Sequence, residues 1–377
     1  MAGIYLHIPF CEHKCIYCDF YSIESLDHVD LFLRSLHSEI DLFRSQCDSA
    51  NIETVFFGGG TPSLLDPSAI GSILDHLASG FSLDAGAEIT LEANPGTVDG
   101  QKLRGFRDAG INRISFGIQS FFDEELAFLT RIHSAEEAIE CVKRARKSGF
   151  SNISVDLIFA LPGQTQSRWE QNLRTAIELT PEHISAYSLI VEQGTPLARM
   201  VKSKLVSPLP LETEASMYEF TMEYLCRAGY EHYEVSNYAK PGFRSVHNGN
   251  YWNHSPYFGF GPSAHSFDSR RRWWNVSNVR RYCELIAKNL LPVSGEETLT
   301  AEERRDEAVM LGLRSGGVDL LQLQRERGVD LFSTNQPLIE KLVDDGLATF
   351  ERSVLRLTDK GFLLCDAISE NLLAAVA

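Results

Sequence analysis

Short hydrophobic runs flanked by turn residues alternate, along the first half of the chain, with segments that have helical periodicity. The runs are rich in Ile, Val, Phe and Tyr, which favour β-strands. Strands separated by helices usually pair in parallel, so this alternation predicts an α/β fold. The predicted strands are Gly3–Ile8, Thr54–Phe57, Glu88–Glu92, Arg113–Gly117, Asn152–Ile158 and His183–Leu189.

Two of the intervening segments carry clear helix boundaries. Ser134 with Glu137 three residues later is typical of a capping box, and Gly149 is a typical stop. A second helix is predicted over Gln166–Leu179, because the chain cannot continue as a helix into Pro181. These helices fit the crossover connections that parallel strands require.

Six strand–helix units are fewer than the eight of a complete TIM barrel. We therefore predict a partial (β/α)6 TIM-like barrel over residues 1–240, with a flat doubly wound sheet as the alternative. Residues 241–299 are dense in Gly, Pro, Asn and aromatic residues and show little periodicity. We interpret them as a loop-rich segment that closes over the barrel mouth.

Residues 300–377 return to helical patterns and form a predicted C-terminal accessory domain. A short hairpin follows the helices, and this order is typical of a winged-helix-like α+β domain. The predicted elements are helices at Ala301–Arg314, Leu320–Arg327 and Pro337–Asp345, strands at Leu347–Phe350 and Val354–Leu357, and a last helix from Asp359. This region holds 9 basic and 14 acidic residues, a balance that disfavours DNA binding.

Charge and composition narrow the classes of function further. The chain of 377 residues has 51 acidic and 35 basic residues, a net charge of −16, which is unfavourable for binding nucleic acid. No secretory signal and no run of 18 apolar residues is present, so we expect a cytoplasmic protein without a membrane span. In that compartment the eight cysteines are expected to be thiols or metal ligands.

Three of these cysteines lie within eight residues, directly after the first predicted strand. Thiolates at Cys11, Cys15 and Cys18 are suited to an iron–sulfur cluster, with one iron left open for a further ligand. The alternative is a zinc site completed by His7 or His13, because structural zinc usually has four protein ligands. The other cysteines have no ligand-like spacing and are interpreted as unreactive thiols: Cys47, Cys141, Cys226, Cys283 and Cys365.

The Cys-x3-Cys-x2-Cys spacing, with Tyr17 just before the last cysteine, resembles the radical S-adenosylmethionine (SAM) superfamily. The resemblance implies a [4Fe–4S] cluster whose open iron binds SAM. It also implies an electron donor, since one electron from the cluster cleaves SAM to methionine and a 5′-deoxyadenosyl radical.

Polar or glycine-rich motifs follow the ends of several predicted strands, where barrel enzymes carry their chemistry. They are Gly58–Pro62, Glu92, Gln119, Arg131 and Asp156. Each alone has a simpler interpretation: a tight turn for the glycines, strand-end caps for the carboxylates and a surface charge for the arginine. Their position at matching ends of successive strands favours one shared site.

The same set resembles the oxygen-independent coproporphyrinogen III oxidase branch of the superfamily. Carried over to this chain, the resemblance implies a first SAM contacted by Tyr5, Gly59, Gly60, Thr61 and Glu92. It implies a second SAM contacted by Gln119, Arg131 and Asp156.

Within that branch the chain resembles the HemW-type haem chaperones more than the oxidases. The oxidases have a fourth cysteine where this chain has Phe20, and a long N-terminal extension that is absent here. The His-Asn-x-x-Tyr-Trp motif of the chaperones matches His247–Trp252. Its imidazole suits an axial haem ligand, although a structural histidine is the simpler interpretation of His247. His254 and His265 are weaker candidates.

The resemblance implies a protein that binds haem and passes it to client haem proteins, membrane respiratory enzymes among them. The cluster and SAM would then act in homodimer formation or in gating the transfer. Two alternatives remain open: a coproporphyrinogen III oxidase and a radical SAM enzyme acting on another substrate. Arg270–Arg272 could pair with haem propionates, but we favour a solvated basic turn.

Overall fold

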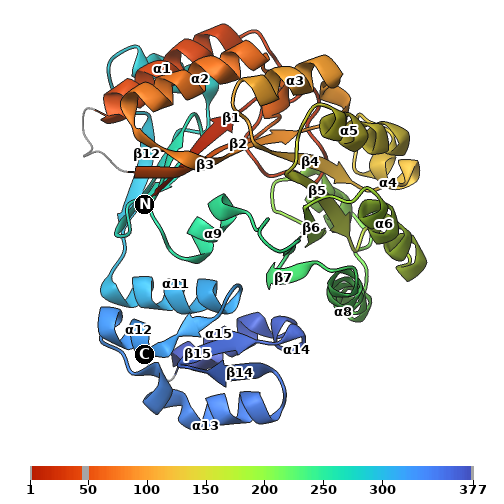
Figure 1. The fold of residues 1–377 in the computed structure, drawn as a ribbon, viewed down its shortest axis with the longest axis vertical. Helices are drawn as coiled ribbons and strands as arrows, with labels where there is room; N and C mark the ends of the chain where they lie inside the picture. Colours follow the sequence, from red (N-terminus) through yellow and green to blue (C-terminus); the bar gives the residue numbers. More distant parts are fainter. Residues whose placement is uncertain (1, 45–50, 375–377) are drawn as a thin grey trace.

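Six parallel strands form the centre of the protein, as the sequence predicts. The computed structural model describes residues 2–44 and 51–374, so Cys47 lies outside the described residues. The strands lie in chain order and curve into an open half-barrel (Figure 1). They are β1 (Ala2–Ile8), β2 (Asn51–Gly59), β3 (Ser82–Ala93), β4 (Arg113–Gln119), β5 (Ile153–Phe159) and β6 (His183–Ser188).

Helices cover the outer, convex face of these strands (Figure 1). Ser134 and Glu137 form the predicted capping box, and the second predicted helix ends at Glu178, before Pro181. The helices of this half of the chain are α1 (Val29–Arg44), α2 (Pro67–Gly80), α3 (Gly100–Asp108), α4 (Asp123–Phe128), α5 (Ala135–Lys147), α6 (Gln166–Glu178), α7 (Pro196–Lys202) and α8 (Leu211–Arg227).

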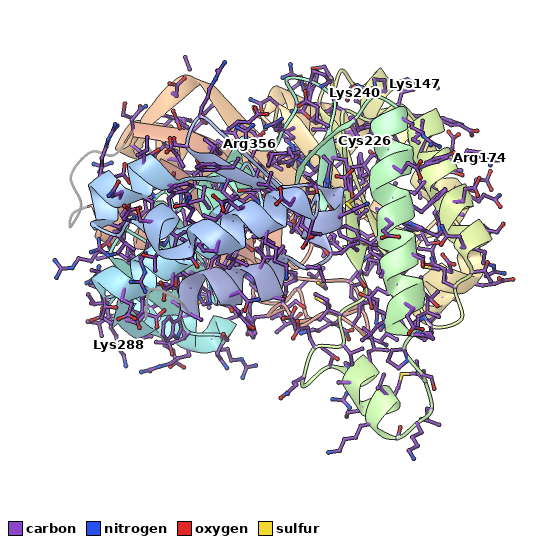
Figure 2. The ribbon with its side chains drawn as sticks, turned by 90° about the horizontal axis from the view of Figure 1, so that it is seen from below. Lys147, Arg174, Cys226, Lys240, Lys288 and Arg356 are labelled. Carbon is purple, nitrogen blue, oxygen red and sulfur yellow. The ribbon has the colours of Figure 1, made fainter. Side chains whose placement is uncertain are left out.

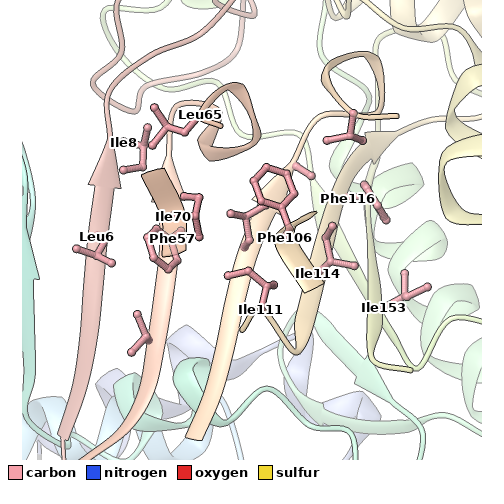
Figure 3. Close-up of a cluster of buried hydrophobic side chains, with 14 of the residues drawn as sticks. Leu6, Ile8, Phe57, Leu65, Ile70, Phe106, Ile111, Ile114, Phe116 and Ile153 are labelled. Atoms are coloured by element: carbon pink, nitrogen blue, oxygen red, sulfur yellow. The ribbon is translucent and has the colours of Figure 1, made fainter. Parts of the chain in front are cut away.

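The main hydrophobic core lies between the strands and this outer helical layer. Figure 3 shows Leu6 and Phe57 from neighbouring strands facing Ile70 and Phe106 from the helices; all four are fully buried. Successive side chains of a strand point to opposite faces, so the residues between these apolar positions face the inside of the barrel. Tyr5 and His7 alternate with Leu6 in this way, and the inner face is therefore available for polar groups.

The segment 241–299 is more regular than its composition predicts. Its strands extend the sheet beyond β1 in the order β12-β11-β10-β9-β1, and β8 with β7 extends it beyond β6. An unpaired β1 edge would leave backbone donors and acceptors free, and the aromatic strand β9 pairs with that edge. The added elements are β7 (Glu231–Glu234), β8 (Asn237–Ala239), α9 (Val246–Trp252), β9 (Tyr257–Phe260), β10 (His265–Phe267), β11 (Arg271–Asn275), α10 (Val279–Ile286) and β12 (Val293–Thr298).

Helix α9 lies inside the half-barrel and does not cap its mouth. Its backbone amides at Val246 and His247 donate to the carboxylate of Glu88, in the middle of β3. The His247 ring reaches Thr54, near the start of the paired part of β2. The helix therefore packs toward the amino-terminal halves of the strands, whereas the mouth is formed by their carboxyl ends.

The C-terminal region has its own small core and the predicted winged-helix elements. The three-stranded sheet has the order β13-β15-β14. Helix α13 begins six residues before the predicted start, because Asp330 caps it and Pro337 is accommodated inside. The elements are α11 (Ala301–Leu313), β13 (Val318–Asp319), α12 (Leu320–Arg327), α13 (Leu331–Asp344), β14 (Ala348–Glu351), β15 (Val354–Leu357), α14 (Asp359–Phe362) and α15 (Cys365–Ala374).

Within the described residues, every helix is too short or too polar to cross a lipid bilayer.

The buried side chain of Glu39 connects the added segment 241–299 to the barrel through hydrogen bonds. Glu39 of α1 accepts hydrogen bonds from the Gly261 amide (2.7 Å), the Asn275 side chain (2.7 Å) and the Tyr282 hydroxyl (2.6 Å). These partners come from the end of β9, from β11 and from α10. Burial raises the pKa of Glu39 to about 7 despite these hydrogen bonds, because removing a carboxylate from water disfavours its charged form.

We predict that Glu39→Gln removes a pH-dependent loss of stability. A carboxyl group whose pKa is higher in the folded than in the unfolded protein favours folding below the unfolded pKa, and this advantage disappears as the pH rises to about 7. The wild type should therefore lose about 3 kcal/mol relative to Glu39→Gln between about pH 4.5 and 7. Thermal unfolding of both proteins across this range measures the difference. Glu219→Gln, at an exposed position of α8, should track the wild type; an identical pH profile for Glu39→Gln would contradict the prediction.

Candidate functional site

The loop after β1 holds the three clustered cysteines at the barrel mouth. Cys11 and Cys15 are buried, Cys18 is partly exposed, and all three are free thiols. Two backbone hydrogen bonds stabilise the loop. The Cys11 amide donates to the Ile23 carbonyl (2.9 Å), and the Cys18 amide donates to the Cys15 carbonyl in a turn (3.2 Å). These contacts position three sulfurs on one short loop, as the spacing predicts.

The cysteines fit an iron–sulfur cluster better than a zinc ion. Among the described residues, no three His, Cys, Asp or Glu side chains converge to hold a single metal ion. Both ring nitrogens of His7 are engaged, with Tyr5 and the Tyr21 carbonyl, and His13 pairs with Glu24 at the surface. Ligands of a cluster bind different irons, so their sulfurs need not converge on one point.

The electrostatics of the loop also suit a group that carries positive charge. Burial, with the other two cysteine sulfurs nearby, raises the pKa of Cys18 to about 11. A thiol with so high a pKa is uncharged in the protein alone, and coordinated iron would stabilise its thiolate form. Two polar side chains already face the sulfurs: the Thr61 hydroxyl lies 3.6 Å from Cys11 Sγ, and Arg131 Nη1 lies 3.4 Å from Cys15 Sγ.

The glycine-rich loop after β2 packs directly against the start of the cysteine loop. The Gly60 amide donates to the Ile8 carbonyl (2.8 Å) and the Thr61 amide to the Phe10 carbonyl (2.7 Å). A Cβ on Gly60 would lie only 2.6 Å from the Phe10 oxygen. Gly59 has a φ of +103°, which L-residues rarely adopt. Backbone contact with the cysteine loop therefore requires glycine here.

One cavity of about 470 Å³ opens at the mouth beside these loops. It brings together the ends of β2 to β6, as expected for a barrel site. Nearly all of the predicted SAM residues line it: Gly59, Gly60, Thr61, Glu92, Gln119, Arg131 and Asp156, together with Cys18. The size is within the range of small-molecule sites.

Two half-buried carboxyl groups, those of Glu92 and Asp156, lie on the wall of this cavity. Burial raises the pKa of Glu92 to about 8, and nearby Asp156 adds to the rise. Burial also raises the pKa of Asp156, although Ser185 (2.7 Å) and Ser115 (3.0 Å) donate hydrogen bonds to it. The wall can thus present hydrogen-bond donors as well as acceptors at neutral pH.

Arg131 links the cysteine loop to the end of β4. Its Nη2 donates to the Gly117 carbonyl (2.6 Å), while its buried Nε has no partner among the described residues. An arginine with a free donor in a cavity is suited to a carboxylate ligand. Gln119, at the end of the same strand, has a φ of +72° and turns the chain there.

Tyr5 and His247 are the predicted SAM and haem residues that lie outside this cavity. Tyr5 lies behind it, with its hydroxyl 3.2 Å from His7 Nδ1 and close enough to Glu92 for an electrostatic interaction. His247 Nδ1 lies 2.8 Å from the Thr54 hydroxyl, and Nε2 lies 2.9 Å from the Tyr251 hydroxyl. Its ring stacks on Phe56, with centroids 4.9 Å apart.

Three of the other cationic and histidine candidates, Arg271, Arg272 and His254, are paired with carboxylates. Arg271 pairs with Glu296, and Arg272 with Glu307 (2.7 Å), but both residues lie in strand β11, so the basic turn that we favoured for this run is wrong. His254 Nε2 also pairs with Glu307 (2.9 Å). Glu307 belongs to α11, so these contacts join the edge of the sheet to the C-terminal domain.

The end of the sixth strand supplies lining residues that the sequence reasoning missed. They are Tyr187, Ser188, Leu189, Ile190 and Glu192. The rule that placed motifs at the ends of the second to fifth strands applies equally to β6, and it would have identified them. Ser188 also donates a hydrogen bond to Glu214 of α8, which fixes this edge of the mouth.

Sequence comparison gives two family matches that divide the chain as the fold does. Residues 5–176 match the radical SAM superfamily, and residues 299–364 match the HemN C-terminal domain. The first match covers the cysteine loop and five of the six central strands. The second covers most of the winged-helix-like region.

Similar proteins extend the likeness to nearly the whole chain. The haem chaperone HemW of Bacillus subtilis is 38% identical, covering 97% of both chains, and that of Lactococcus lactis is 34% identical, covering 98% of this chain and 96% of its own. Among solved structures, the radical SAM enzyme coproporphyrinogen III oxidase (HemN) of Escherichia coli superimposes with a TM-score of 0.84. It is 23% identical, over 98% of this chain and 89% of its own, and this likeness concerns the fold alone.

We predict that Gly60→Ala separates the two loops and impairs assembly of the site. The added Cβ would overlap the Phe10 and Ile8 carbonyl oxygens, and backbone cannot move aside cheaply. The variant should be destabilised by about 1–3 kcal/mol and should retain less iron after anaerobic reconstitution. Thermal unfolding and iron analysis measure these effects.

Gly71→Ala is the matched control, because a Cβ there meets its nearest neighbour at an ordinary 3.6 Å. It should keep the wild-type iron content and gain stability from the better helix propensity of alanine. Equal iron content and stability for both variants would contradict the prediction.

Proposed function

Because the chain belongs to the radical SAM superfamily and, within it, to the HemW family, we propose that it is a haem chaperone with a [4Fe–4S] cluster and SAM. The observation that supports this most is the convergence of the cysteine loop, the Gly58–Gly60 loop and the ends of β3 to β5 on one cavity. In this proposal the protein binds haem and passes it to client haem proteins. It works in the cytoplasm, where thiols stay reduced.

In this proposal different residues of the chain bind the cluster and SAM. Cys11, Cys15 and Cys18 hold the cluster, and Arg131 and Thr61 face two of their sulfurs. When bound, the cluster and SAM together supply a one-electron route to a 5′-deoxyadenosyl radical. Glu92 lies beside the Gly59 backbone. Its raised pKa lets it donate a hydrogen bond to a ribose hydroxyl, and a bound ammonium group would instead favour its carboxylate form. Tyr5 positions His7 and Glu92 from behind.

The residues proposed for a second SAM line the same cavity. Arg131 brings a guanidinium to this cavity, and its buried Nε has no partner among the described residues; Asp156 brings a carboxyl group that accepts a hydrogen bond from Ser185. Gln119 completes this group at the end of β4. These residues also favour the second candidate function, an oxygen-independent coproporphyrinogen III oxidase. Phe20 disfavours it, because an exposed phenyl ring stands at the mouth where the oxidases have a cysteine.

His247 stays a proposed axial ligand of the haem iron. Burial lowers its pKa to about 3, so the ring is neutral and keeps a lone pair for a metal at physiological pH. Ligation requires one ring nitrogen to exchange its partner, and Nε2 is the nitrogen that faces a neighbour of the same helix, Tyr251. Haem binding at this position therefore involves rearrangement of α9.

We predict that replacing Cys11, Cys15 and Cys18 with alanine abolishes the cluster and leaves the fold intact. After anaerobic reconstitution, the wild type should contain about four iron and four sulfide per chain, and the variant close to none. Cys226→Ala, at an exposed thiol away from the mouth (Figure 2), should match the wild type. Zinc without sulfide in the wild type would contradict the cluster.

Haem binding and catalysis are tested on the same preparation. Titration with haem should reach stoichiometric uptake, followed by transfer to an apo haem protein. Incubation with coproporphyrinogen III, SAM and dithionite should yield no protoporphyrinogen IX. Repeated turnover of that substrate without haem uptake would favour the oxidase instead.

We predict that His247→Ala changes the absorption spectrum of bound haem and weakens its binding, because an axial ligand is lost. Tyr251→Phe should keep the ligand-derived spectrum, since it removes only the hydroxyl that Nε2 would release. His76→Ala serves as the control, because this histidine lies in α2 on the outer helical layer and was not a candidate haem ligand. An unchanged spectrum and affinity for His247→Ala would assign the iron ligand to another residue.

A further inference from the structure

A short arm projects from the barrel mouth between β6 and α8. It consists of residues 193–211, which run from the loop after β6 through helix α7 to the first residue of α8, and Figure 2 shows it standing clear of the body of the molecule. Thr195 caps α7 by accepting a hydrogen bond from the Ala198 amide (3.1 Å), so the arm has a fixed local structure. None of the predicted SAM or haem residues lies on it.

The arm carries unpaired positive charge in an acidic protein. Residues 193–211 contain Arg199, Lys202 and Lys204 and no carboxylate, although Glu192 and Glu212 flank this range and the whole chain has a net charge of −16. All three cationic side chains are exposed. Within the part of the chain that the structure describes, none pairs with a carboxylate, and the Arg199 guanidinium only donates to the Gly194 carbonyl (3.0 Å). Other surface arginines, such as Arg174, do pair.

Exposed apolar side chains accompany these cations. Leu205 is 76% exposed and Leu211 is 80% exposed, whereas leucines elsewhere in the barrel are mostly buried. Exposed apolar side chains on a segment with charges of one sign are typical of a surface that binds a protein partner of opposite charge.

The arm is bonded to the loop that carries the cysteines. The buried Leu197 of α7 donates its amide hydrogen to the carbonyl of Ile16, at 2.9 Å. Ile16 lies between Cys15 and Cys18, so the arm stands beside the proposed cluster. The loop itself exposes the carboxylates of Glu12 and Asp19 against one cation, Lys14, whose Nζ donates to the Phe20 carbonyl (2.8 Å), so its net charge disfavours an anionic partner. The arm is therefore the favourable approach for such a partner.

We propose that residues 193–211 dock an acidic one-electron carrier protein that reduces the cluster. The proposal rests on the cluster assigned under the proposed function. One electron passes from the reduced carrier to the cluster, so the carrier is oxidised by one electron as the cluster is reduced by one. The net charge of −16 repels an acidic carrier over most of the surface, and the local field of the arm directs it to the mouth.

The test compares two double variants with the same change in net charge. Lys202→Glu/Lys204→Glu reverses the charge of the arm. Lys147→Glu/Lys288→Glu makes the same change at exposed positions far from it (Figure 2). The probe is reduced flavodoxin, a small acidic flavoprotein, mixed anaerobically with the reconstituted protein. Stopped-flow absorbance gives the rate of cluster reduction, and titration with oxidised flavodoxin gives the Kd.

At low ionic strength the arm variant should be reduced at least about tenfold more slowly than the control variant, with a correspondingly weaker Kd. The difference should disappear at about 1 M salt, where charges are screened within a few ångströms. Dithionite, which needs no docking surface, should reduce both variants at the wild-type rate.

Equal rates and equal Kd values for the two variants with flavodoxin would overturn the docking surface. So would binding of the arm to phosphatidylglycerol vesicles without any effect of the variants on flavodoxin. If dithionite failed to reduce even the wild type, the cluster itself would be rejected, and the docking surface with it. Normal dithionite reduction with unaffected flavodoxin kinetics would reject the docking surface alone.

Discussion

The contact between the Gly58–Gly60 loop and the end of β1 is the constraint on which the site depends. Because β1 and β2 pair in parallel, the loops that follow them lie at the same end of the sheet. Backbone hydrogen bonds from Gly60 and Thr61 join these two loops. The cysteine loop can approach this closely only because no Cβ intervenes. The proposed cluster and the proposed SAM contacts therefore share one piece of backbone, and neither can shift alone.

The inner face of the half-barrel is polar, and this has an electrostatic consequence. Glu92 and Asp156 are surrounded by protein, and their raised pKa values reflect the cost of charging a carboxyl group away from water. His247, deeper in the same interior, is neutral for the same reason. A charged ligand that enters the mouth would change the pKa values of these groups. Ligand binding and protonation are therefore coupled there.

The proposed cluster and the proposed haem ligand occupy different parts of this interior. The cysteines are at the carboxyl ends of the strands, whereas α9 packs near Thr54 and Glu88. The C-terminal domain is joined to the second region through Glu307, which pairs with both His254 and Arg272. The arm at residues 193–211 belongs to the first region, through Leu197 and Ile16. Electron entry and haem binding would thus approach the barrel from different sides.

By itself, the sequence determined the six parallel strands, the helices between them and the three clustered thiols. These features depend on local patterns: alternation of apolar residues, caps such as Ser134 with Glu137, and short ligand spacing. The strand-end rule also identified most of the cavity, from Gly59 to Asp156, because parallel strands bring their ends together regardless of detail.

Only the tertiary structure decided where residues 241–299 lie. This segment has no strong periodicity in its Gly, Pro and aromatic residues. Part of it forms strands because the backbone groups at the edge of β1 need hydrogen-bonding partners, and β9 pairs with that edge. The same long-range packing placed His247 among Thr54, Phe56 and Tyr251. A motif fixes which residues are present, but the partners of a buried ring nitrogen come from distant segments, and no local pattern specifies them.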